Sequence, residues 1–91
     1  MDNLVKLALL YDLYGALLTD KQQETFEAYH HENLSLRELG RAYGISPQGV
    51  RDSVKRSEAL LMDYEEKVGF LAYQQAMDKK LDNLRERGYN V

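Results

Sequence analysis

Apolar side chains recur at steps of three and four residues along most of the chain, which is the period expected of amphipathic α-helices. The resulting stripes lie at residues 4–18, 26–30, 36–43, 50–68 and 70–84. No stretch shows the strict alternation of apolar and polar residues that is typical of β-strands. The pattern therefore predicts an all-α protein with about five helices.

The first stripe covers an unusually wide arc of its helix. One row consists of Leu4, Leu7, Tyr11, Tyr14 and Leu18, and a second row beside it consists of Leu10, Leu13 and Leu17. A wide apolar arc indicates that the helix is buried on two sides. Either all of these side chains belong to the core of one chain, or one side is an interface between two copies. The second interpretation predicts a homodimer.

Capping residues place the starts of the next two helices. Thr19 with Gln22, and Ser35 with Glu38, fit the capping box. In this motif a hydroxyl accepts a hydrogen bond from a backbone N–H, and the side chain three residues later reaches back to the cap. We therefore expect one helix from about residue 20 to residues 30–33 and a short helix over residues 36–43.

Residues 36–56 have the pattern of a helix-turn-helix motif. Gly44 can adopt the left-handed conformation that ends a helix at a sharp turn, and Ser46 followed by Pro47 is a favourable helix start. The small and apolar positions that the motif requires are filled by Leu39, Gly40, Tyr43, Ile45 and Val50, with Ile45 expected to fill the corner. Ser53 stands at a further position that is usually apolar, and we expect Val54 to replace it.

A long helix should follow the turn. Its stripe consists of Val50, Val54, Leu61, Tyr64 and Val68, with Ser57 as the one polar interruption. This pattern predicts a helix of about 20 residues, after which Gly69 either bends it or separates it from a fifth helix. We expect a single helical domain over residues 1–91, with a helix-turn-helix core at about residues 20–58 and a C-terminal helical extension at about residues 59–88.

Composition narrows the possible classes of protein. The 91 residues are 44% apolar and 30% charged, include no cysteine and carry a formal net charge of −3. Disulfides and thiolate metal sites are therefore excluded. The longest early apolar run, residues 7–11, stops at Asp12 and is too short for a secretory signal or a membrane span. We expect a cytoplasmic protein without membrane insertion.

Positive charge is concentrated in the predicted helix-turn-helix. Residues 35–57 carry five cations and two anions, whereas residues 1–34 carry two and six, and residues 58–91 carry five and seven. The candidate binding residues for nucleic acid or a partner are Arg37, Arg41, Gln48, Arg51, Lys55 and Arg56. Such side chains can read base edges or hold phosphates. Gly49 offers no side chain and Asp52 repels phosphate, so a solvated basic helix face is an equally open interpretation.

The histidines provide little support for catalysis. His30 and His31 are adjacent, and adjacent residues on a helix diverge by about 100°, so the two rings cannot face one metal ion. The second helix is also expected to turn His30 inward together with Phe26 and Tyr29. We therefore expect no enzyme activity, no metal site and no cofactor.

Particular segments resemble known families. The run LTDKQQETFEAYHHENLSLRELGRAYGIS resembles the last DNA-binding region of bacterial sigma factors. A broader set is similar to the YlxM family of small bacterial helix-turn-helix proteins: YGALLTDKQ (14–22), LSLRELG (34–40), GIS (44–46), VRDSVKRSE (50–58) and LLMDYEEKVG (60–69). The resemblance implies a sigma region 4-like helix-turn-helix, of the winged-helix-type superfamily but without a wing, with a long C-terminal helical extension. Pro47, Gly49 and Arg51 stand where the family usually has an arginine, an alanine and an aromatic residue.

The YlxM resemblance also implies a function. Proteins of that family are linked to the signal recognition particle, as regulators of protein targeting that bind the RNA or the protein component of the particle. We therefore expect a non-catalytic regulator with the candidate binding residues above as its contact surface. The alternative is a DNA-binding transcriptional regulator acting as a dimer, whose two recognition helices would lie about 34 Å apart on the duplex.

Overall fold

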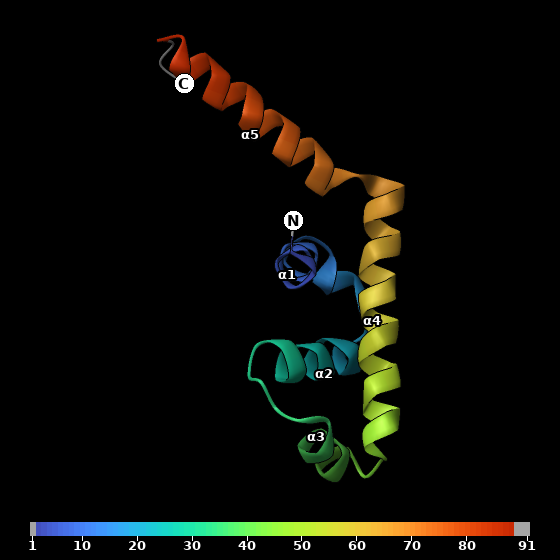
Figure 1. The fold of residues 1–91 in the computed structure, drawn as a ribbon. Coiled ribbons are helices and arrows are strands. Elements are labelled where there is room, and N and C mark those ends of the chain that lie inside the picture. The colour runs from blue at the N-terminus through green and yellow to red at the C-terminus, as the bar shows by residue number, and fades with distance from the viewer. Residues whose placement is uncertain (1, 89–91) are drawn as a thin grey trace.

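The computed structural model describes residues 2–88, which fold into five α-helices and one short 3₁₀ helix (Figure 1). In chain order these are α1 (Asn3–Tyr14), η1 (Gly15–Leu17), α2 (Asp20–His30), α3 (Leu36–Tyr43), α4 (Pro47–Val68) and α5 (Phe70–Glu86). No β-strand occurs in residues 2–88. The prediction of an all-α helix-turn-helix protein with about five helices is therefore confirmed.

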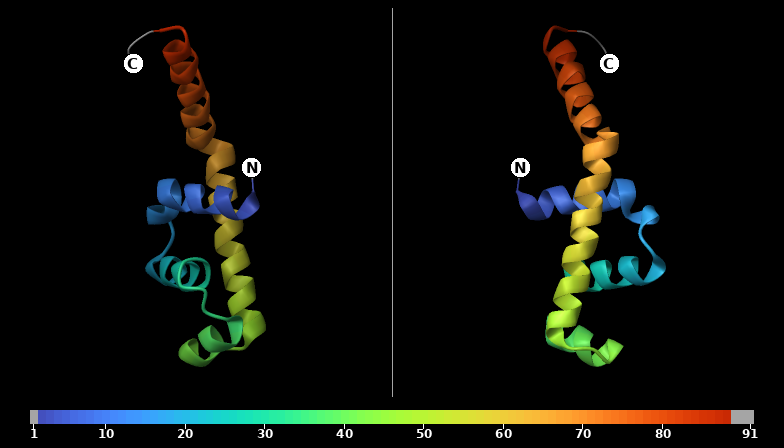
Figure 2. Two further views of the ribbon diagram at one scale, coloured as in Figure 1. Left: turned by 60° about the vertical axis from the view of Figure 1, so that its left-hand side comes forward. Right: turned by 90° about the vertical axis from the view of Figure 1, so that its right-hand side faces the viewer.

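The longest helix, α4, contacts each of the three preceding α-helices. Figure 1 shows α1, α2 and α3 one above another along one side of α4, while α5 leaves from its C-terminal end in a new direction. The two further views in Figure 2 show the same arrangement from other sides. The molecule is therefore elongated, with principal dimensions of 58 × 25 × 19 Å.

Two apolar clusters join the short helices to α4. One contains Leu7, Leu10, Tyr14, Leu18, Phe26, Leu61 and Leu71. The other, within the helix-turn-helix, contains Ala28, Leu39, Val50 and Val54. Burial of each large apolar side chain favours folding by about 1.5–3 kcal/mol. Ser57, the predicted polar interruption, is only 1% exposed, so it continues the buried face of α4.

The first predicted helix is shorter than its apolar stripe. α1 ends at Tyr14, and the chain turns through η1 before α2 begins. A Cβ atom at Gly15 would lie only 2.9 Å from the Tyr11 ring, so the glycine allows this turn to pack against that ring. Leu4 is 65% exposed and Leu17 is 62% exposed, whereas the other residues of the two rows are buried or half-buried, so the chain itself covers most of the wide arc.

The predicted helix starts are confirmed by their hydrogen bonds. The hydroxyls of Thr19, Ser35 and Ser46 accept from backbone N–H groups three residues later, at 3.1, 3.0 and 3.0 Å. Gln22 and Glu38 complete the two capping boxes by reaching back to the caps. These bonds satisfy N–H groups that would otherwise have no partner inside their helices.

Close backbone packing forms the corner of the helix-turn-helix. Gly44 has a φ of 68°, a left-handed conformation that ends α3 as predicted. A Cβ atom at Gly40 would lie 2.7 Å from the carbonyl oxygen of Ile45, so only a glycine lets the turn approach α3 this closely. The prediction that Ile45 fills the corner is wrong, because its side chain is 48% exposed. Val54 is buried in place of Ser53, as predicted.

Gly69 separates α4 from α5 rather than bending a continuous helix. Its φ of 70° is left-handed, and its N–H donates to the carbonyl oxygen of Glu65 at 2.7 Å. Gly69 has no side chain to cap α5, so other groups accept from the first N–H groups of that helix. The Tyr14 hydroxyl accepts from Phe70 at 3.2 Å, and the Glu65 carboxylate accepts from Leu71 and Ala72 at 3.0 and 3.1 Å.

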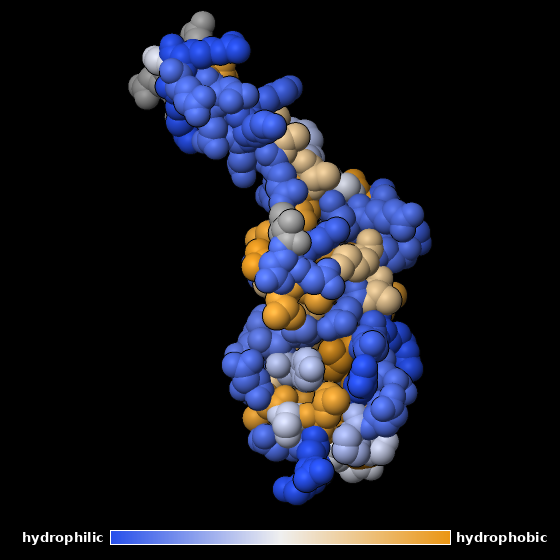
Figure 3. Space-filling view, in the orientation of Figure 1, coloured by the Kyte–Doolittle hydropathy of each residue, from blue (hydrophilic) through white to orange (hydrophobic). Residues whose placement is uncertain are grey.

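The apolar stripe of α5 is largely uncovered. Phe70, Tyr73 and Met77 are 44%, 59% and 37% exposed, and Leu71 is the buried residue of this helix. Val68 was predicted to continue the buried face of α4, but it is 62% exposed because α5 turns away beside it. On the face shown in Figure 3, hydrophobic residues gather over the helical body, whereas the α5 arm is mainly hydrophilic.

The Glu65 carboxylate should stabilise the junction in a pH-dependent way. Burial raises its pKa, but hydrogen bonds from the Tyr14 hydroxyl (2.7 Å) and the two α5 amides outweigh burial, so the pKa lies below its ordinary value. The stabilisation is therefore complete above the ordinary glutamate pKa and is lost as the pH falls through the lowered pKa. We expect Glu65→Gln to reduce the free energy of unfolding by about 1.5–3 kcal/mol at neutral pH, measured by urea unfolding.

Urea unfolding at acidic pH distinguishes the effect of the Glu65 charge from the effect of its shape. The difference between the wild type and Glu65→Gln should narrow as both are acidified, because the wild-type carboxylate is then also neutral. Glu66→Gln, on the exposed neighbour, is the matched control and should change little. A Glu65→Gln deficit that stays constant from neutral pH into acid would contradict this account.

Candidate nucleic-acid interface

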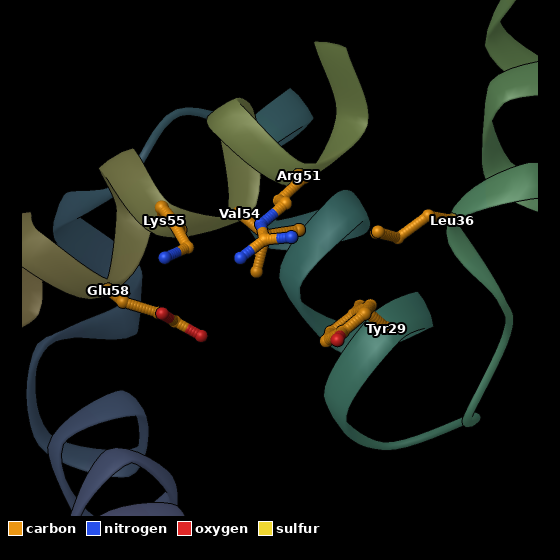
Figure 4. Close-up of a pocket in the computed structure, with 6 residues that line it drawn as sticks. All are labelled: Tyr29, Leu36, Arg51, Val54, Lys55 and Glu58. Atoms are coloured by element: carbon orange, nitrogen blue, oxygen red, sulfur yellow. The ribbon is translucent and has the colours of Figure 1, made fainter. Parts of the chain in front are cut away.

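The second helix of the helix-turn-helix forms one wall of a hollow that is also lined by α2 and α3. Its volume is about 310 Å³, and it is lined by Tyr29, Leu36, Arg51, Val54, Lys55 and Glu58. Figure 4 shows Arg51, Lys55 and Glu58 on α4, across the hollow from Tyr29 of α2 and Leu36 at the start of α3. The hollow therefore combines an aromatic ring, apolar side chains and charges of both signs.

The spacing of residues on α4 explains which of its side chains reach the hollow. Arg51, Lys55 and Glu58 follow one another at steps of four and three residues, so they lie along one flank of the helix. Val54 lies between them and is only 4% exposed, which anchors this flank to the core. The two cations are exposed, so they stand at the mouth of the hollow.

The loop between α2 and α3 brings the other wall into place. Asn33 adopts a positive φ of 58°, and the N–H of Leu34 donates to the carbonyl oxygen of Ala28 at 3.0 Å. This bond folds the chain back over the end of α2. Ser35 then caps α3, so Leu36 begins that helix opposite Tyr29 (Figure 4).

A contact with His30 fixes Glu58, the acidic residue that lines the hollow. His30 Nε2 lies 2.7 Å from Glu58 Oε2, and the side chains are 13% and 27% exposed. The His30 ring also lies against Phe26, with centroids 4.3 Å apart. His30 therefore points inward as predicted, and its ring fixes the position of the Glu58 carboxylate.

The six predicted binding residues occupy three different places. Arg51 and Lys55 share the hollow. Arg37 and Arg41 are exposed on α3, on the side of that helix away from buried Leu39.

On the outer face of α4, the Gln48 amide donates to Asp52 at 3.0 Å, and both side chains are exposed. Arg56 is exposed too, but it is turned about 100° from Lys55 around the helix. The structure thus brings two of the predicted cations together in one concave site and leaves the other four residues exposed outside it.

Sequence reasoning missed two residues of this site. Tyr29 was interpreted only as an inward-facing residue of α2, and Glu58 was not singled out. The steps of four and three from Arg51 to Glu58 are a signal that could have placed Glu58 beside the cations. No comparable signal exists for Tyr29, because its approach to the cations depends on how α2 packs against α4.

The described residues support no metal site. Among residues 2–88, no group of three or more histidine or acidic side chains could hold a metal ion. Within the same range, none of the helices is long and apolar enough to cross a membrane. The hollow is the candidate site because it gathers two of the predicted cations with an acid and an aromatic ring.

Comparison with known proteins identifies the family. The model of the UPF0122 family, described as "Putative helix-turn-helix protein, YlxM / p13 like", matches residues 1–90. A UPF0122 protein of Caldanaerobacter subterraneus is 48% identical over 85 residues, which cover 93% of this chain and 73% of the relative. Another, from Symbiobacterium thermophilum, is 45% identical over 86 residues, covering 94% of this chain and 80% of the relative. A third, from Fusobacterium nucleatum, is 37% identical over 86 residues, covering 94% and 84%. The chain therefore belongs to the UPF0122 family of YlxM- and p13-like helix-turn-helix proteins.

Proposed function

We propose that this protein is a cytoplasmic, non-catalytic regulator of protein targeting that binds the signal recognition particle through the hollow beside α4. The observation that carries the proposal is that Arg51 and Lys55 stand together in a concave site on the second helix of the helix-turn-helix. Two cations so placed can hold successive phosphates. The YlxM resemblance supplies the particle as the partner, and the aromatic ring of Tyr29 favours its RNA over its protein component.

The inner wall of the hollow also supports a binding role. His30 and Glu58 are bonded to each other at 2.7 Å, and the His30 ring lies against Phe26 with centroids 4.3 Å apart. The ring therefore holds the Glu58 carboxylate in a fixed position on the wall of the hollow.

The outer face of α4 supports a second candidate function, DNA binding. α3 and α4 form a helix-turn-helix whose recognition helix starts with exposed Pro47 and Gln48. Gln48 already donates to Asp52, and Asp52 repels phosphate, so one copy has few groups left for base reading. Tight binding would require two copies of the chain on one duplex.

Changing the charge of the basic groups tests the proposed function. Arg51→Glu and Lys55→Glu, combined in one variant, should weaken binding to reconstituted signal recognition particle by more than about tenfold, since phosphate contacts become repulsive. Fluorescence anisotropy at about 50 and 200 mM salt measures the affinity and its salt slope. Circular dichroism checks that the helices remain.

A variant with the same change of charge on α5 is the control. Lys79→Glu and Lys80→Glu together should affect binding only weakly, because these exposed residues lie outside the hollow. Equal losses in both variants would show that net charge alone matters. Absence of particle binding together with salt-resistant binding to duplex DNA would favour the second candidate.

We also propose a homodimer, in which exposed apolar residues of the N-terminal segment meet those of a second copy. Leu4, Val5 and Leu17 are 65%, 52% and 62% exposed. Light scattering at micromolar concentration should give twice the mass of the chain for the wild type. Leu4→Glu with Leu17→Glu should give a monomer, because a buried unpaired charge is costly. A wild-type monomer at this concentration would contradict the dimer.

A further inference from the structure

We propose that the hollow between α2, α3 and α4 binds one unpaired guanine base of a single-stranded nucleic acid. This inference deepens the proposed function and rests on it, because it names the part of the RNA that the site would take. It concerns Tyr29, Arg51, Lys55 and Glu58, which line the hollow together.

The shape of the site suits a base that is not paired within a duplex. The hollow has a volume of about 310 Å³, at the lower end of the range of about 300–1,000 Å³ for small-molecule sites, so it suits a single ring system. In a duplex, the bases are stacked and only their edges face the grooves. A base must therefore be unpaired and unstacked to enter a concave site of this kind.

The walls provide the contacts that a flat base requires. Tyr29 is a half-buried aromatic residue on one side, and Leu36 and Val54 supply apolar surface. Bases stack on such rings whatever their sequence, so Tyr29 contributes affinity rather than specificity. A second shallow hollow, of about 410 Å³, shares Tyr29 and Leu36 with the first, so a strand could continue past the ring.

The cations and the acid are arranged for a nucleotide rather than for a free anion. Arg51 and Lys55 are exposed at the mouth, where the phosphates of an inserted nucleotide would lie. Glu58 is half-buried, with 27% of its side chain exposed, and carries a negative charge into the hollow. An anion lodged beside Glu58 would be repelled, whereas a neutral base with hydrogen-bond donors would be attracted.

The Glu58 carboxylate selects guanine among the bases. An ionised carboxylate only accepts hydrogen bonds, and its two oxygens can accept from two adjacent donors. Guanine presents such a pair on its Watson–Crick edge, N1–H and the N2 amino group, whereas adenine, cytosine and uracil each present a single donor beside an acceptor. His30 Nε2 lies 2.7 Å from Glu58 Oε2. His30 thereby acts as a positioning residue that keeps the two carboxylate oxygens of Glu58 directed into the hollow.

Labelled uridine octamers with one central substituted base test the inference. Fluorescence anisotropy should show that wild-type protein binds the guanosine octamer about tenfold more tightly than the adenosine, cytidine or all-uridine octamers. Inosine, which lacks the N2 amino group, should bind with an intermediate affinity. The same series with deoxyribose separates RNA from single-stranded DNA as the natural source of the base.

Two variants assign the preference to its residues. Glu58→Gln, which can still accept a hydrogen bond from His30, should abolish the preference for guanosine over inosine and leave binding of the all-uridine octamer unchanged. Glu66→Gln, on an exposed site of the same helix, should keep the preference. Tyr29→Leu should weaken binding of every octamer by a similar factor, because it removes the stacking ring.

The outcomes distinguish this inference from the proposed function. Equal binding of all octamers by the wild type, or a guanosine preference that survives Glu58→Gln, overturns the guanine site and leaves particle binding in place. Failure to bind any octamer, with particle binding retained, also overturns the guanine site alone. Failure to bind both the octamers and the particle overturns the two proposals together.

Discussion

The packing of three short helices against one face of α4 is the interaction on which the rest of the structure depends. Val50, Val54, Ser57 and Leu61 are all at most 4% exposed, and they give this helix one continuous buried face. Because the same face serves the helix-turn-helix and the N-terminal cluster, the recognition helix cannot rotate without disturbing the whole core. The flank that carries Arg51, Lys55 and Glu58 is consequently fixed relative to α2 and α3.

This constraint explains why the candidate site lies on the flank of α4 and not on its outer face. Beside the buried face, side chains of α4 meet those of α2 and α3 and form a concave surface. On the outer face, Gln48 and Asp52 bond to each other, and both side chains are exposed. Concave sites on rigid helices hold a ligand in one orientation better than convex ones do. Binding specificity in this chain is therefore expected where the three helices meet.

The local parts of the fold were predictable from the sequence, and the long-range parts were not. The caps at Thr19, Ser35 and Ser46 and the stop at Gly44 depend on neighbouring residues, so their patterns predict them. The exposure of Ile45 depends on the close backbone approach at Gly40, and the exposure of Val68 depends on the direction of α5. The spacing of apolar residues along the sequence does not determine either feature. In the site, the cations could be chosen by charge, and the spacing along α4 places Glu58 beside them. The approach of Tyr29 and Leu36 depends instead on how α2 and α3 pack against α4, which the sequence pattern does not contain.

The most direct test of the central claim is a map of the bound surface by nuclear magnetic resonance. Backbone amide shifts of the isotope-labelled protein would be followed while a single-stranded RNA containing one guanosine is added. The account predicts the largest changes on the walls of the hollow, at residues 29, 36, 51, 54, 55 and 58. Changes confined to the outer surfaces, at Arg37, Arg41, Gln48 and Asp52, would contradict it.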